Sequence, residues 1–181
     1  AVEVAKAHKA HIVVAVLGEE EKLLERGKLF TKAMAVCCKQ KYATGVYTSG
    51  VVFEPRFYEG LADMLKEDEL PIFNWVWFGL YRSEGGLNGY TYGMDVFGKE
   101  EMEVLNTDAE PEELRDFLAS LASYVLACDV TLQDGETIGF SADDKHTITR
   151  SPGVSLPEEQ MTLKISYEPT EVEPETDDDS I

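Results

Sequence analysis

The stretch from Leu70 to Tyr81, LPIFNWVWFGLY, most constrains the fold because it is apolar on both sides. Taken as one long strand, it places Phe73, Trp75 and Trp77 on one face and Val76 and Phe78 on the other. A strand that is apolar on both faces has to be covered on both, by helices or by a partner. The stretch therefore predicts a core strand. The alternative is an aromatic binding face, which Tyr90 and Tyr92 would extend from the returning strand.

The spacing of apolar residues along the rest of the chain predicts the other elements. Helical spacing predicts helices over 19–40, from Pro55 to Leu65, and over 112–128. Short apolar or alternating runs predict strands over 11–17, 44–53, 90–97, 102–105, 137–140, 146–149 and 161–167. The first of these, HIVVAVL, is β-branched and nearly all apolar, as is typical of a central strand. The order predicts an α+β fold: a mixed sheet with an early βαβ unit, later antiparallel strands, and about three helices packed on the sheet.

Charge and composition divide the chain into a body and a tail. The segment from Glu168 to Ile181 has seven acidic residues, no basic residue and almost nothing apolar. Such a segment buries too little surface to offset its ordering entropy. We therefore expect one α+β domain over 1–167 and an acidic flexible tail over 168–181.

The net charge excludes two classes of partner. The chain has 35 acidic residues against 16 Lys and Arg, which gives a net charge of −19. Nucleic acids need a basic face, and the largest basic cluster is Lys39-Gln40-Lys41. Anionic membrane surfaces are disfavoured for the same reason, and no apolar run reaches the roughly 18 residues of a transmembrane helix. We expect no nucleic acid, no membrane and, if there is a protein partner, a basic one.

No complete motif for a cofactor, a metal ion or a nucleophile stands out. Cys37, Cys38 and Cys128 fall in helical segments and suit small buried hydrophobes of a reducing compartment, which indicates a cytoplasmic protein. His8 and His11 would share a face only on one continuous helix, and a strand is predicted to start at His11. There is no P-loop, no HExxH and no complete GxSxG. We expect no cofactor and no metal site.

Charged side chains in the second half of the chain offer a further candidate site. Glu101 and Glu103 point to one side of the strand predicted at 102–105, where paired carboxylates could do acid–base work. A half-exposed strand gives the same pattern, so a solvated face is the simpler interpretation. Arg150 is one of few cations in the last third and could pair with an acid or bind a carboxylate through both nitrogens.

Several blocks together resemble the bacterial domain of unknown function 4261 (DUF4261) family. They are AHIVVAVLG, LPIFNWVWFGLY, GYTYGMDVFGKEEMEVL, LASYVLACDVTLQDGETIGFS, and SPG before MTLKISY. The resemblance implies no activity and no catalytic residue, and it implies that a usual N-terminal segment is missing here. A weaker similarity over 90–138 is to Suppressor-of-fused-like domains, which act as binding modules and occur among bacterial toxin-immunity proteins.

Three hypotheses for the function follow. The first is a non-catalytic protein-interaction domain, immunity-like, that inhibits a basic partner such as a toxin nuclease. The second is an enzyme of unrecognised class with a carboxylate and tyrosine cleft near Trp75, Tyr90 and Glu101. The third is an oligomeric component in which the aromatic strand pairs with another copy. The binding residues on which these hypotheses depend are Trp75, Trp77, Tyr90, Tyr92, Glu101, Glu103 and Arg150.

Overall fold

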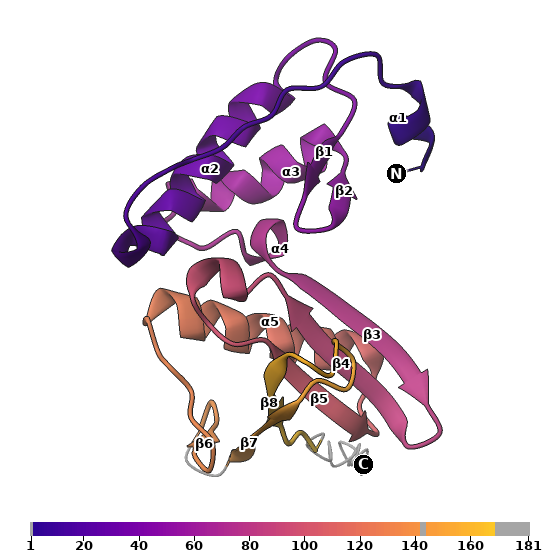
Figure 1. Cartoon of the computed structure of the whole chain (residues 1–181), viewed down its shortest axis with the longest axis vertical. Helices are drawn as coiled ribbons and strands as arrows, with labels where there is room; N and C mark the ends of the chain where they lie inside the picture. Colours follow the sequence, from indigo (N-terminus) through magenta and orange to yellow (C-terminus); the bar gives the residue numbers. More distant parts are fainter. Residues whose placement is uncertain (1, 142–143, 169–181) are drawn as a thin grey trace, which may run out of the picture.

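The computed structural model describes residues 2–141 and 144–168, which form two lobes joined at a short helix, α4 (Figure 1). One lobe contains α1 (Val2–Ala7), the 3-10 turn η1 (Glu20–Lys22), α2 (Leu23–Cys38), β1 (Val46–Thr48), β2 (Val51–Phe53), α3 (Pro55–Ala62) and η2 (Asp63–Lys66). The other contains β3 (Trp77–Ser83), β4 (Gly86–Tyr92), η3 (Asp95–Phe97), β5 (Met102–Thr107), α5 (Pro111–Ala127), β6 (Thr137–Ile138), β7 (His146–Pro152) and β8 (Met161–Ile165). Apart from Glu168, the predicted acidic tail lies outside the described residues.

The second lobe is a mixed six-stranded sheet with α5 on one face. The strand order is β3-β4-β5-β8-β7-β6, and β5 and β8 are the one parallel pair in it. Leu114, Leu118, Leu121 and Val125 of α5 are buried against the sheet, as their helical spacing predicts. The α+β class, the mixed sheet and the helices packed on it are thus confirmed.

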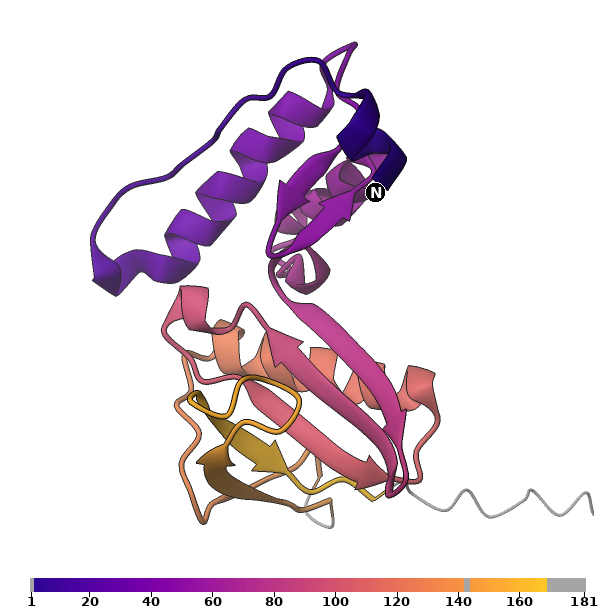
Figure 2. The same ribbon diagram turned by 45° about the vertical axis from the view of Figure 1, so that its right-hand side comes forward.

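The predicted early βαβ unit does not form. Residues 11–17 are in no strand, and Ile12, Val13 and Leu17 are 79%, 81% and 90% exposed. Figure 2 shows this segment running along the outside of α2, away from both sheets. Apolar, β-branched residues form a strand only where a sheet edge accepts their hydrogen bonds, and within residues 2–141 and 144–168 no edge does.

The predicted strand over 44–53 is instead a hairpin. β1 and β2 pair antiparallel, with Thr48 opposite Val51. The two turn residues, Ser49 and Gly50, have φ angles of 50° and 74°. Positive φ at both central positions is what a type I′ turn requires. Gly50 is therefore the turn of a hairpin and does not simply interrupt a strand.

The aromatic stretch is also shorter as a strand than predicted. Residues Ile72–Trp75 form the helical turn α4, and β3 starts only at Trp77. Two side-chain bonds stabilise the turn: Asn74 Nδ2 donates to the Tyr58 carbonyl at 3.1 Å, and Trp75 Nε1 donates to Thr31 Oγ1 at 2.7 Å. These contacts with the first lobe outweigh the β propensity of the sequence.

Candidate functional site

An exposed aromatic face lies at the edge of the six-stranded sheet. In the β3–β4 ladder, Trp77 is opposite Tyr92, and Gly79 is opposite Tyr90. The ring of Tyr90 lies across Gly79, where a Cβ atom would come within 2.2 Å of the tyrosine Cζ, so any larger residue there would displace the ring. Trp77 is 46% exposed and Tyr92 is 48% exposed, while Tyr90 is half-buried. Three of the predicted binding residues thus lie side by side.

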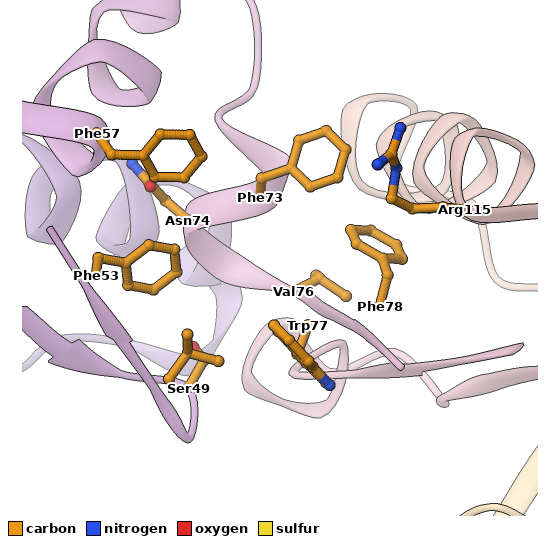
Figure 3. A pocket seen from close by; sticks show the side chains of 10 residues that line it. Ser49, Phe53, Phe57, Phe73, Asn74, Val76, Trp77, Phe78 and Arg115 are labelled. Atoms are coloured by element: carbon orange, nitrogen blue, oxygen red, sulfur yellow. The ribbon is translucent and has the colours of Figure 1, made fainter. Parts of the chain in front are cut away.

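Next to this face, an apolar groove of about 260 Å³ runs between the lobes (Figure 3). Phe53 and Phe57 approach it from β2 and α3, and Phe73, Phe78 and Trp77 from the other side. Ser49, Val51, Asn74, Val76 and Arg115 complete the lining. The groove suits an apolar or aromatic group, because nearly all of its wall is carbon.

Two polar side chains of the groove, Arg115 and Ser49, are already partnered, whereas the buried Oδ1 of Asn74 accepts no hydrogen bond from the described residues. Arg115 is bound to acids of its own helix, with Nη2 2.9 Å from Asp116 Oδ1 and 3.6 Å from Glu112 Oε1. Ser49 Oγ donates to the Trp75 carbonyl at 3.1 Å. Within the lining there is no pair of titratable groups that could exchange a proton with a bound molecule. The described lining therefore offers apolar contact area and no titratable pair.

Glu101 is buried, which makes the prediction of a solvated face wrong. Only 1% of it is exposed. Its carboxylate accepts hydrogen bonds from Thr91 Oγ1 (2.7 Å), and from the N–H groups of Gly93 (2.7 Å) and Met94 (2.9 Å). Burial raises the pKa of Glu101, and the bond from Thr91 opposes that rise. The side chain fixes the chain as it leaves β4.

Glu103 is fully buried and fixes a second loop in the same way. Its carboxylate accepts from the N–H groups of Val154 (3.2 Å), Ser155 (2.9 Å) and Leu156 (3.1 Å). Lys164 Nζ, from the neighbouring strand β8, lies 3.0 Å from Glu103 Oε2. A carboxylate with this many hydrogen-bond donors around it has a structural role. The prediction of a solvated face fails here too, because the loop over 153–156 covers this strand.

Two other predicted residues lie away from the aromatic face. Trp75 is 4% exposed, and its ring packs on Phe97 with centroids 5.0 Å apart, so it does not share a face with Trp77. Arg150 forms a bidentate pair with Glu100, with both Nε and Nη2 within 2.9 Å of the carboxylate. Arg150 thus pairs with an acid of the chain, which is the first of the two roles considered for it.

His146 lies in a buried cluster that the sequence did not indicate. Its Nδ1 is 2.8 Å from the Ser166 carbonyl, and its Nε2 is 2.7 Å from Asp144 Oδ1. Its ring packs on Phe117 at 4.7 Å, and the hydroxyl of Tyr167 donates to Glu113 at 2.7 Å. These contacts join the sheet to α5, so the cluster stabilises the second lobe.

The acid-rich stretch from Glu100 to Asp116 does not form one acidic patch. Glu101 and Glu103 are buried, and Glu100 is paired with Arg150. Glu112 and Asp116 pair with Arg115, and Glu113 accepts from Tyr167. Three cations, Arg115, Arg150 and Lys164, pair with acids of this stretch, so most of its eight acidic charges are not neutralised, although they do not share one face.

Neither a metal-binding cluster nor a membrane-spanning helix is found in the described part of the chain. Within residues 2–141 and 144–168, no group of three or more His, Cys, Asp or Glu side chains is placed to bind a metal ion. In the same ranges no helix combines the length and apolarity needed to cross a membrane.

Among the described residues, the aromatic face and the groove define a candidate binding site with no complete catalytic group. The family model "Domain of unknown function (DUF4261)" matches residues 90–166. The match runs from within β4 to just beyond β8 and confirms the family resemblance over that stretch. Comparison with curated proteins found no match, and comparison with solved structures found none either.

The groove residues that the sequence analysis missed are Phe53, Phe57, Phe78, Asn74 and Arg115. They come from five elements, β2, α3, α4, β3 and α5, which lie in three separate parts of the chain. No local spacing links them, so only the approach of the two lobes reveals them as one site.

Proposed function

We propose that this chain is a non-catalytic protein-interaction domain that binds its partner through the aromatic face and the adjoining groove. The observation that carries the proposal is the exposure of Trp77 and Tyr92 beside a groove lined by four phenylalanines. Large aromatic side chains contribute most of the binding energy at protein interfaces, where they fill pockets on the partner or on the domain. A partner side chain, aromatic or aliphatic, is the group the groove would take.

The charge supports a basic partner. A chain with net charge −19 attracts a positively charged protein at long range, and this attraction weakens as salt is added. A toxin nuclease, whose own surface must attract nucleic acid, has this character, and an immunity-like role would consist of covering that surface. Three free thiols suit a reducing cytoplasm, where we place the protein.

The enzyme hypothesis depended on side chains that take part in structural contacts, among them Glu101 and Trp75. Glu101 and Glu103 accept backbone hydrogen bonds and line neither the groove nor the second cavity, of about 380 Å³, beside α2. Trp75 lines that second cavity, but its indole N–H is already used in the bond to Thr31. No observation on the described residues favours a reaction at these positions, so binding is the better-supported proposal.

The test is affinity capture from the source cell at low salt, with three baits: the wild type, Trp77→Ala and Tyr124→Ala. Tyr124 is the matched control, because it is 43% exposed but lies on α5 outside the groove lining. We expect a basic protein on the wild-type and Tyr124→Ala baits and its loss from the Trp77→Ala bait. Recovery of no protein, or equal recovery on all three baits, would contradict the proposal.

A further inference from the structure

The segment from Ile12 to Leu17 has the chemistry of a strand but no strand partner. Ile12, Val13 and Leu17 are among the most exposed large apolar side chains of the described residues. No backbone hydrogen bond joins residues 9–18 to the rest of the described chain, and one side-chain bond, from Arg26 Nη2 to the Val16 carbonyl at 3.4 Å, touches the segment. Exposed aliphatic patches of this kind mark interaction sites.

The outer edge of β3 carries backbone hydrogen-bonding groups that no other strand of the described chain pairs with. β3 is an end strand of the six-stranded sheet, and Figure 1 shows no element beside its outer edge. Ser83 and Gly86 flank a two-residue turn, and in such hairpins the flanking pair exchanges both hydrogen bonds. The alternation then directs the N–H and C=O groups of Phe78, Leu80 and Arg82 away from β4. None of these groups bonds another element of the described chain.

The two surfaces also match in length and in character. The segment has six residues from Ile12 to Leu17, and β3 has seven. The segment bears no charge, and the start of β3 borders the apolar groove through Trp77 and Phe78. A strand added there would place alternate side chains over the groove and satisfy the unpaired edge.

We propose that the segment Ile12–Leu17 of one copy adds as a strand to the outer edge of β3 in a second copy of this chain. A reciprocal exchange closes the assembly as a twofold dimer. Neither the segment nor residues 77–81 of β3 bear a charged side chain, so the contact itself adds no like-charge pair to the repulsion between two chains of charge −19.

Salt separates this inference from the proposed function. Two chains of charge −19 repel each other, so added salt should strengthen the dimer, whereas it should weaken the binding of a basic partner. The inference can be tested without the partner, because its measurements use the purified chain alone.

The experiment is sedimentation equilibrium of the purified chain at 20 mM and 300 mM NaCl, together with hydrogen exchange across a range of protein concentrations. We expect a mass of twice 20.2 kDa, more fully populated at the higher salt. Amides of residues 12–17 and of Phe78, Leu80 and Arg82 should gain protection as the concentration rises. A monomer at both salts, protection that does not depend on concentration, or a dimer without protection at these residues would overturn the proposal.

Two matched pairs of variants test the contact itself. Val13→Glu should weaken the dimer by about tenfold or more, the effect of 1.4 kcal/mol, whereas Val36→Glu adds the same charge at a site on α2 that is 61% exposed and should not. Arg82→Pro removes an outward N–H that β4 does not use, and Arg82→Ala keeps it. We expect only the proline variant to weaken the dimer; equal effects within either pair would contradict strand addition.

Discussion

Replacing Glu103 with alanine should strongly destabilise the protein. The carboxylate is fully buried and lies 3.0 Å from Lys164 Nζ, whose side chain is 15% exposed. Removing one partner of a buried ion pair costs about 3–5 kcal/mol, because it leaves the other charge without compensation. The N–H groups of Val154, Ser155 and Leu156 lose their acceptor too, but water can reach a surface loop, so we do not add a separate cost for them.

The assay is urea unfolding, with the free energy of unfolding compared between the wild type, Glu103→Ala and Glu100→Ala. Glu100 is the matched control: it is paired with Arg150, but at the surface, where an ion pair contributes about 1 kcal/mol or less. A loss of less than about 1 kcal/mol for Glu103→Ala, or equal losses for the two variants, would refute the assignment of Glu103 as a buried loop anchor.

Two further predictions concern buried polar groups. Thr31→Val leaves the Trp75 indole N–H without its 2.7 Å acceptor, so the free energy of unfolding should fall by about 1–3 kcal/mol in the same urea assay, and an unchanged value would contradict the bond between α2 and α4. Because burial raises the pKa of Glu101 above 4.5, the stabilisation linked to its proton is complete below pH 4.5 and is lost as pH rises through the raised pKa. Glu101→Gln should therefore make stability flatter against pH from about 4.5 upward in urea titrations, and an unchanged slope would contradict the shift.

Elements with a strong local pattern could be predicted from the sequence. The apolar stripe of α5 is buried as its spacing predicts, and Leu163 and Ile165 of β8 lie in the core, but Thr162 is fully buried against the predicted alternation. The strands predicted over 70–81 and 90–97 correspond to β3 and β4, although β4 starts at Gly86 and residues Asp95–Phe97 form the 3-10 turn η3. In each of these, the partner surface lies near in sequence or the pattern itself is long enough to be specific.

The predictions from the sequence are wrong where tertiary contacts determine the local structure. Residues Ile72–Trp75 look like part of a strand, but bonds from Asn74 and Trp75 to the first lobe stabilise a helical turn. Glu101 looks solvated, yet it is buried because backbone N–H groups following β4 converge on it. Neither signal is local, so spacing along the chain could not reveal it.

The central claim is that Trp77 and the groove beside it bind a protein, and a dissociation constant measured by calorimetry tests it most directly. The titrant is the basic protein recovered by affinity capture, and the chains compared are the wild type, Trp77→Ala and Tyr124→Ala at two salt concentrations. Loss of a central aromatic residue costs about 2 kcal/mol or more, so we expect Trp77→Ala to weaken binding by about thirtyfold, and Tyr124→Ala to bind as the wild type does. Equal affinity for Trp77→Ala and the wild type would contradict the account.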